Sequence, residues 1–348
     1  MRIALDAMGT DRHPATEIEG AIQALHELPG DFEVVLVGDS ARIEAELARH
    51  TVPAGRLRVV HAGDVIEPGE PAVTAVRRKP DSSIVVGLKL QKQGKADAFV
   101  SAGSTGAVMA ASLFLFRAIP GVDLPAVGAI LPTTTQPCLL IDAGANIDCK
   151  PQQLLQFARL GSIYVEDVWQ RPAPRVGLLN IGEEPEKGDE RTLQTYQLLR
   201  ASNLNFVGNI EGRDVIRGSC DVLVADGFVG NVLLKFYESV MSFTYGMVMT
   251  EFAGTDAAAG LEDLFRVFDY TEYGGAPLLG VNGITIICHG GSPPRAVCNA
   301  IRVAIQAVDT QLVGHIERSV GAASASSVGE GQGRAGAAAG ASTDREDA

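Results

Sequence analysis

The sequence predicts an α/β fold in which a largely parallel sheet carries helices on both faces. Short apolar runs rich in β-branched residues recur along the chain, and each ends in glycine with aspartate, asparagine or serine. Several of these runs are followed by helical periodicity, so the pattern is strand, loop and helix, repeated. In sheets of this kind, ligands bind beyond the carboxyl ends of the strands. We therefore expect the functional site in the glycine-rich loops that follow the strands.

Eight strands are expected in order along the chain. The first is RIAL at residues 2–5, which lacks the charged and apolar regions of a signal peptide. The other seven runs are EVVLVGD (33–39), LRVVHAGD (57–64), DAFVSAGSTGA (97–107), CLLIDAGAN (138–146), VGLLNIGEE (176–184), DVLVADGFVGN (221–231) and ITIICHGGS (284–292).

The pattern changes twice, which divides the chain. After Asn231 a long helical segment, a Gly-Thr-Asp break and a second helical segment predict a helical hairpin over residues 232–270 that projects from the sheet. Residues 319–348 consist largely of alanine, glycine and serine with scattered charges, which predicts a disordered tail. We expect one catalytic α/β domain over residues 1–318, with the hairpin inserted in it.

Composition limits the classes of function. With 348 residues, 46% of them hydrophobic, the chain can bury a large core. A formal net charge of −13 argues against nucleic-acid binding, so anionic substrates must meet local positive sites. Five cysteines without a C-x-x-C pair suggest neither a disulfide framework nor a zinc site, which fits a reducing cytoplasm. The longest apolar stretch, residues 107–116, is too short to cross a bilayer.

Several common catalytic motifs are missing from the sequence. The nearest approach to a P-loop, at residues 182–188, has lysine and glycine in the reverse order, which argues against a nucleotide triphosphatase. No G-x-G-x-x-G follows a strand, and no G-x-S-x-G presents a serine nucleophile. The site must therefore work without an obvious covalent nucleophile.

Three strand-end loops are rich in backbone amides and small side chains. The loop at residues 101–110 opens a helix, whose N-terminal amides can hold an anion, although a tight turn with a serine cap explains the same pattern. The loops at residues 142–151 and 226–235 allow the same two interpretations, with Pro151 expected as a first helical residue. The candidate binding residues in these loops are Ser101, Gly103, Ser104, Thr105, Gly106, Asp142, Asn146, Asp148, Asp226, Gly227, Gly230 and Asn231.

A fourth loop carries cations among acids. Lys187, Gly188 and Arg191 follow an expected strand in a segment where most residues are charged. Either the loop is solvated and pairs with itself, or its cations bind an anionic substrate. His289, in CHGGS at a strand end, is the histidine best placed for a site, with a structural hydrogen-bonded role as the alternative.

Six motifs in order give the chain a resemblance to the phosphate acyltransferase (PlsX) family of bacterial phospholipid synthesis. They are DAMGTD (6–11), SAGSTGA (101–107), LLIDAGANIDCKPQQLLQFA (139–158), NIGEEPEKGDE (180–190), ADGFVGNVLLK (225–235) and YGGAPLLGVNG (273–283). The resemblance runs from residue 1 to about residue 315 and adds Asp6 and Gly9 to the candidate binding residues. The usual family pattern has glycine where Thr10 stands and asparagine where Ser104 stands, so these two residues are weaker candidates for direct contact.

The resemblance implies a Rossmann-like homodimer related to phosphate acetyltransferases and isopropylmalate dehydrogenases. It implies that inorganic phosphate attacks the thioester of a fatty acyl carrier protein, giving acyl phosphate and free carrier. Phosphate is already a nucleophile and a thioester already an activated donor, so we expect no cofactor and no metal. Positioning can supply about 7 to 11 kcal/mol and one oxyanion donor about 3 to 4 kcal/mol. We expect Lys187 and Asn231 to supply the charge and the hydrogen bond.

Partners and location follow from the same resemblance. Lys89, Lys92 and Lys95 form a basic face expected to steer the acidic carrier protein. The hairpin is expected to pack in the dimer, with its tip touching the membrane peripherally, where a glycerol-3-phosphate acyltransferase would take the product. Two other functions stay open: a short-chain phosphate acetyl- or butyryltransferase that uses coenzyme A, and a non-catalytic membrane scaffold for lipid synthesis.

Overall fold

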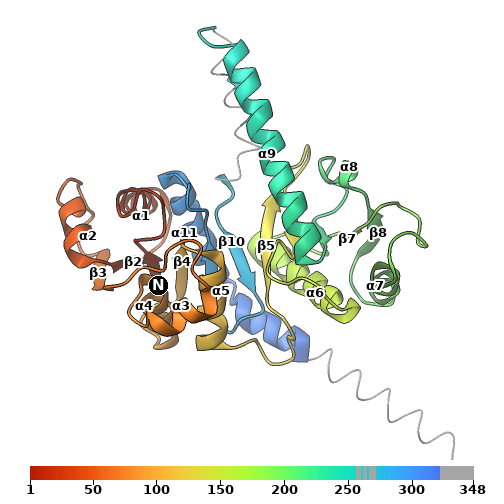
Figure 1. Cartoon of the computed structure of the whole chain (residues 1–348), viewed down its shortest axis with the longest axis horizontal. Coiled ribbons are helices and arrows are strands. Elements are labelled where there is room, and N and C mark those ends of the chain that lie inside the picture. The colour runs from red at the N-terminus through yellow and green to blue at the C-terminus, as the bar shows by residue number, and fades with distance from the viewer. Residues whose placement is uncertain (256–259, 262–264, 266–271, 322–348) are drawn as a thin grey trace, which may run out of the picture.

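A computed structural model describes residues 1–255, 260–261, 265 and 272–321. In this part of the chain eleven strands form one sheet in the order β3-β2-β1-β4-β11-β10-β5-β6-β9-β7-β8 (Figure 1). Seven of the ten neighbouring pairs are parallel and three are antiparallel. The predicted fold class, a largely parallel sheet between helices, is confirmed.

The sheet has two parallel halves. The first half contains β1 (Arg2–Asp6), β2 (Glu33–Gly38), β3 (Leu57–His61), β4 (Ala98–Ser101) and β11 (Thr285–Ile287). The second half contains β6 (Cys138–Ile141), β7 (Val176–Leu179), β8 (Phe206–Ile210) and β9 (Val222–Val224). All eight predicted strands are present among these nine, and β8 is an addition.

Two further strands join the halves and reverse the direction of the sheet. They are β5 (Ala126–Leu131) and β10 (Ala276–Leu279), which the sequence did not predict. The pairs β11–β10, β10–β5 and β5–β6 are all antiparallel. Three reversals leave β6 running opposite to β11. The loops after the strands of the two halves therefore leave from opposite edges of the sheet, not from one edge as the strand–loop–helix pattern suggested.

Alternating side chains of the strands build one core on each face of the sheet. Ile3 and Leu5 face one core, whereas Ala4 faces the other. The first core is covered by α1 (Ala15–Glu27), α2 (Ser40–Leu47), α6 (Pro151–Val168), α7 (Glu190–Arg200) and α11 (Pro294–Asp309). The second is covered by α3 (Ala72–Arg78), α4 (Ser83–Lys92), α5 (Thr105–Phe116), α8 (Gly212–Val215) and the base of α9 (Gly227–Glu251). As predicted, α6 begins at Pro151.

Helix α9 projects away from the body of the protein (Figure 1). Asp226 caps it by accepting hydrogen bonds from the amides of Phe228 and Val229, so Asn231 lies in the second turn and not at the helix start. The buried Tyr237 hydroxyl donates to the carbonyl of Pro132 and anchors the base of the helix. Among the described helices, none combines the length and the apolar character needed to cross a membrane.

Parts of two predictions fall outside the described residues. The return limb of the hairpin, including Leu264 and Phe268, lies largely there, as do residues 322–348 of the predicted tail. The described part of the return limb includes Phe265, whose ring meets that of Tyr245 edge to face. At the other boundary, residues 312–321 are helical and Val320 packs into the first core, so folded structure continues past residue 318.

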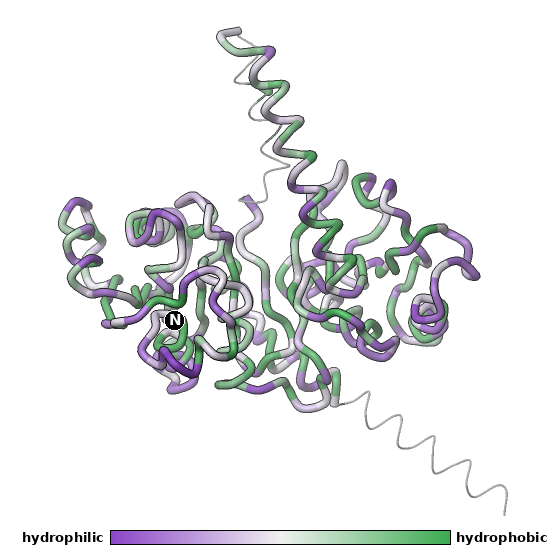
Figure 2. Tube along the Cα trace, viewed as in Figure 1, coloured by the Kyte–Doolittle hydropathy of each residue, from purple (hydrophilic) through white to green (hydrophobic). Residues whose placement is uncertain are grey.

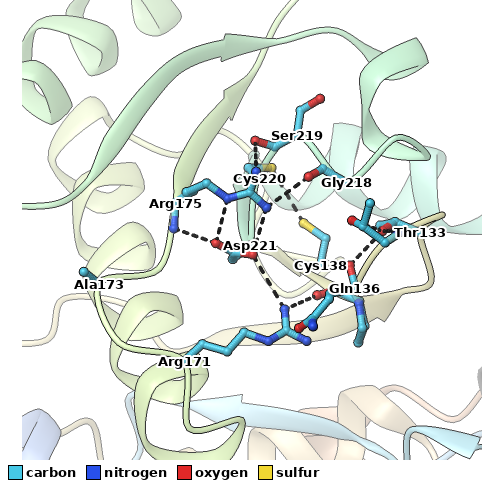
Figure 3. A network of polar contacts seen from close by, with 12 residues as sticks. Thr133, Gln136, Cys138, Arg171, Ala173, Arg175, Gly218, Ser219, Cys220 and Asp221 are labelled. Carbon is cyan, nitrogen blue, oxygen red and sulfur yellow. Dashed lines mark hydrogen bonds and ion pairs between the residues drawn. The ribbon is translucent and has the colours of Figure 1, made fainter.

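An arginine network ties the amino-terminal ends of three second-half strands together (Figure 3). The Arg175 side chain donates to both carboxylate oxygens of Asp221, at 3.0 and 3.1 Å, and to the carbonyls of Gly218 and Ser219. Arg171 adds a bond to the carbonyl of Pro137. Burial alone would raise the pKa of Asp221, but the hydrogen bonds from Arg175 outweigh it and the pKa is lowered. The network holds β6, β7 and β9 together at the edge of the sheet opposite the loops that follow these strands.

Candidate active site

The loops after β1 and β4 form one unit. A Cβ atom on Gly9 would lie 2.6 Å from the amide nitrogen of Gly103, so this approach requires glycine. The Ser101 hydroxyl donates to Asp6 at 2.7 Å and accepts from the Gly103 amide at 3.0 Å. Asp6 also accepts from the amide of Met8 at 3.0 Å. The Asp6 carboxylate therefore connects the loop after β1 with the loop after β4.

Asp6 is itself buried, with 1% of its surface exposed. Burial raises its pKa, and the hydrogen bond from Ser101 opposes the rise. Because it faces the interior, we infer that Asp6 supports the loops.

The N-terminus of α5 opens beside these loops. Ser104 is its N-cap and accepts from the amide of Ala107 at 3.4 Å, which confirms the capping interpretation. Thr105 and Gly106 are in the first turn, where amides lack intrahelical partners and the helix dipole favours an anion. A cavity of about 510 Å³, here called the first cavity, lies in front of them. Its lining includes Asp6, Gly9, Thr10, His13, Gly103, Ser104, Thr105 and His289.

The loop after β6 is organised by Asp142 in a different way. Its carboxylate accepts from four backbone amides, those of Val127, Gly144, Ala145 and Asn146. It also accepts from the side-chain amide of Asn146 at 2.8 Å. Burial raises the pKa of Asp142, against these five hydrogen bonds. Asp142 and Asn146 thus bind to their own surroundings.

The start of α9 packs directly on that loop. The amide of Gly227 donates to the carbonyl of Asn146 at 2.7 Å, and a Cβ on Gly230 would overlap the carbonyl oxygen of Asp142. Arg191 pairs with Asp226, the α9 cap, at 3.0 Å. This contact brings the charged loop beside the helix N-terminus, and it means that the Arg191 guanidinium already has a carboxylate partner.

The loop from 180 to 190 holds Lys187 by its backbone. The Lys187 carbonyl accepts from the Asn180 side chain at 3.0 Å. Gly188 has φ +103°, and a Cβ added there would lie 2.2 Å from Thr192 Oγ1 and 2.6 Å from Asn180 Oδ1. The Lys187 side chain is exposed, and within the described residues its ammonium makes no ion pair within 4 Å. Glu183 pairs instead with Arg213 at 3.6 Å.

A second cavity of about 510 Å³ connects the two halves across one face of the sheet. Thr105, Gly106 and Met109 of α5 line one side, and Asn231, Leu234 and Lys235 of α9 line the other. Its floor is apolar and includes Val127 and Ala129 of β5, Ala276 of β10 and Ile287 of β11. His289 lines both cavities.

Four predicted site residues thus meet at the second cavity: Thr105, Gly106, Asn231 and His289. A Cβ at Gly144 would lie 3.3 Å from the Asn231 Cβ, which places Asn231 beside the Asp142 loop. Lys187, Gly188, Arg191 and the exposed Asp148 are outside the linings of both cavities.

The sequence interpretation missed one cation. The Lys235 ammonium lies 3.1 Å from His289 Nε2 and 3.2 Å from the Glu238 carboxylate, on the wall of the second cavity. Lys235 ends the ADGFVGNVLLK motif four residues after Asn231, which is the spacing of one helical face. That spacing is the signal by which the sequence could have identified Lys235.

Solved structures with this fold include phosphotransacylases and a "putative 4-hydroxythreonine-4-phosphate dehydrogenase" from Salmonella typhimurium. The fold matches a phosphotransacetylase from Streptococcus pyogenes with a TM-score of 0.61 at 17% identity, covering 88% of this chain and 94% of the other. It also matches a branched-chain phosphotransacylase from Enterococcus faecalis, with a TM-score of 0.59 at 13% identity and coverage of 88% and 99%. At such identities the likeness defines the fold class alone.

Sequence relatives define the family. Residues 1–315 match a family described as "Fatty acid synthesis protein". The chain is 49% identical to a phosphate acyltransferase of Desulforamulus reducens, over 92% of this chain and 97% of the relative. It is also 49% identical to a phosphate acyltransferase of Heliobacterium modesticaldum, with coverage of 92% and 98%. The chain belongs to the phosphate acyltransferase family, and it is an enzyme of that family.

Proposed function

We propose that this enzyme transfers a fatty acyl group from acyl carrier protein to inorganic phosphate, giving acyl phosphate for phospholipid synthesis. The observation that carries the proposal is the second cavity. Its apolar floor suits an acyl chain, and its two walls present the α5 N-terminus and Asn231 to the polar end. The names of the relatives and of the matched family support acyl transfer to phosphate.

In the proposed mechanism phosphate binds at the N-terminus of α5, between Gly103 and Gly106, where amides and the helix dipole favour an anion. It attacks the thioester carbonyl directly, the carbon–sulfur bond breaks, and the carrier leaves as its thiolate. Asn231 donates its side-chain amide to the carbonyl oxygen as negative charge develops there. No covalent enzyme intermediate is needed.

We assign the remaining cation roles to Lys187 and Lys235. Lys187 is exposed on the loop that Arg191 ties to the start of α9, so its flexible side chain is available to phosphate or to the thioester oxygen. Lys235, on the cavity wall, supplies positive charge close to His289. Asn231 is held in place by the loop after β6 and the start of α9, through Asp142, Asn146, Asp226, Gly227 and Gly230.

The test is release of free thiol from a long-chain acyl carrier protein in the presence and absence of phosphate. We expect release that requires phosphate and yields acyl phosphate in equal amount. Absence of turnover under these conditions would favour the scaffold function. Faster turnover of acetyl- or butyryl-coenzyme A than of the long-chain carrier substrate would favour the short-chain transferase instead.

We propose that the carrier protein docks on a basic face at the end of α4. Lys89 and Lys92 are in the last turn of that helix and Lys95 follows it, so three cations fall close together in a protein of net charge −13. Lys92 and Lys95 are exposed, and the half-buried Lys89 donates to the carbonyl of Pro80. Changing all three to glutamate should raise the Michaelis constant for the carrier substrate, most strongly at low salt. An unchanged constant at low salt would remove this docking face.

The outer part of α9 is proposed to pair with a second copy, with its tip at the membrane surface. Figure 2 shows hydrophobic positions along the projecting helix, and Phe236, Phe243 and Met247 are 68%, 68% and 59% exposed. Acyl phosphate would leave there for a glycerol-3-phosphate acyltransferase. Phe243→Glu should weaken dimerisation, measured by sedimentation, or membrane binding, measured by vesicle flotation, or both. A dimeric variant that floats like the wild type would contradict both roles.

A further inference from the structure

A second buried carboxylate lies behind the first cavity. Glu17, in the first turn of α1, has no exposed surface. One of its oxygens accepts a hydrogen bond from the Thr10 amide at 2.7 Å. Among the described residues, the other oxygen and the hydroxyl of Thr10 are both buried and neither has a hydrogen-bond partner with normal geometry, although the Thr10 hydroxyl is near enough to oppose the rise in the pKa of the carboxyl. An ionised carboxylate in this position would leave a charged oxygen unsatisfied, which is costly in a protein interior.

The contact between Glu17 and Thr10 shapes the cavity wall. The Thr10 carbonyl accepts from Nδ1 of His13 at 2.7 Å, so its two backbone hydrogen-bonding groups are both held by side chains. The next amide, that of Asp11, donates to the carbonyl of Gly290 at 2.9 Å. Thr10 and His13 line the first cavity together with Gly103. Loss of the Glu17 contact would therefore release one wall of the cavity.

Charges on neighbouring elements make the Glu17 site unfavourable for an anion. The negative charge of Asp6 on β1 raises the pKa of Glu17. In the same way, the negative charge of Glu17 raises the pKa of Cys288, which follows β11. His13 acts on Asp6. On α11, which packs along α1, Arg295 pairs with Glu27 in the last turn, at the far end from Glu17.

Burial raises the pKa of Glu17 to about 7, and the charge of Asp6 adds to the rise. The protonation state of this carboxyl therefore changes near neutral pH, directly behind a loop that lines the first cavity.

We propose that Glu17 is a positioning residue for the anion site, and that an anion entering the first cavity drives uptake of a proton by the Glu17 carboxyl. This inference rests on the proposed binding of phosphate at the α5 N-terminus. A dianion in the cavity repels an ionised Glu17, so binding favours the protonated carboxyl, and by linkage protonation strengthens binding by the same factor. No bond other than the O–H bond of the carboxyl forms, and the proton comes from solvent.

Binding calorimetry with sulfate tests the coupling, because sulfate stays a dianion while phosphate titrates in this range. Wild type, Glu17→Gln and the control Glu19→Gln, from the same helix, are compared at about pH 6 and about pH 8. We expect wild type and Glu19→Gln to bind sulfate about fivefold or more weakly at the higher pH. Glu17→Gln, which keeps an acceptor for Thr10 but cannot ionise, should lose most of that difference. A Glu17→Gln variant with the full wild-type pH dependence overturns the inference.

A second measurement needs no change at Glu17, so it holds if that variant does not fold. Proton uptake on sulfate binding is obtained near pH 7 from binding enthalpies in buffers of different ionisation heat. We expect uptake in the wild type, retained in a His13→Asn/His289→Asn variant that removes the two histidines lining the cavity. No uptake in either protein overturns the inference. Failure of the wild type to bind sulfate or phosphate at both pH values would overturn the phosphate site of the proposed function as well.

Discussion

Asp6 ends strand β1 of the first half, Asp142 follows strand β6 of the second half, and the two carboxylates differ in what they organise. Asp142 accepts five hydrogen bonds, and the start of α9 packs onto its loop so closely that Gly230 has no room for a Cβ. Asp6 binds Ser101 and Met8, and the loops that it shapes surround the first cavity. The second-half loop is filled by internal contacts, whereas the first-half loops leave space in front of a helix N-terminus.

From this difference we infer which polar residues bind the substrate and which support the loops, although they look alike in the sequence. Thr105 and Gly106 stand on cavity walls, in the first turn of a helix. Asp142, Asn146 and Asp226 direct their polar groups at the protein itself. Among the predicted site residues of the second half, Asn231 lines the second cavity, and it stands next to the closely packed Asp142 loop. The following predictions test that division of roles.

The largest effect is expected from Asn231→Ala. If Asn231 is the hydrogen-bond donor to the developing oxyanion, kcat should fall about a hundredfold or more, with little change in thermal unfolding. Ser239→Ala, which removes an exposed hydroxyl from the same helix, is the matched control. Initial rates of phosphate-dependent carrier release give the comparison. Near-normal kcat in Asn231→Ala would show that Asn231 is not the oxyanion donor.

Asp142→Ala should act on stability. It leaves four backbone amides and one side-chain amide without their shared acceptor, so the free energy of unfolding should fall by about 3 kcal/mol. Denaturant unfolding measures this change. A variant of wild-type stability that binds phosphate poorly would contradict the comparison, because Asp142 would then be a ligand and not a support.

Lys187→Ala should lower turnover by a factor of about ten or more without affecting the fold, because the side chain is exposed. Lys187→Arg separates two roles: partial rescue favours simple phosphate binding, and no rescue favours a precisely placed donor. Initial rates and thermal unfolding are measured together. Should Lys187→Ala keep normal rates, the loop from 180 to 190 is only a solvated surface.

The smallest effect is expected at the opposite edge of the second half, at Asp221. Its lowered pKa means that its pairing with Arg175 stabilises the fold above the unfolded-state pKa and loses that effect as pH falls through the folded-state value. Between about pH 5 and pH 3, wild type should lose about 1 kcal/mol more than Asp221→Asn, since Arg175 is partly exposed. Urea unfolding at each pH provides the values. Equal losses would mean that the pair contributes nothing to stability.

Local chemistry made much of the fold readable from the sequence. The eight predicted strands combine β-branched residues with a glycine and polar loop, and both features act within a few residues. The Ser104 cap and the start of α6 at Pro151 are local in the same sense. Strands β5 and β10 depart from this pattern, since AVGAIL runs into PTTT, which has no glycine, and APLL contains a proline and no β-branched residue. These are the two strands that reverse the sheet.

The sequence by itself determined the fold class, the family and the loops that carry the polar chemistry, because periodicity, caps and motifs are written in neighbouring residues. Only the tertiary structure decided which loops share a cavity. Strand β11 enters between β4 and β10, Lys235 meets His289 across 54 positions, and Glu17 lies under Thr10 in the buried interior. Such contacts depend on strand order and burial, which involve residues far apart in the chain and leave no local pattern.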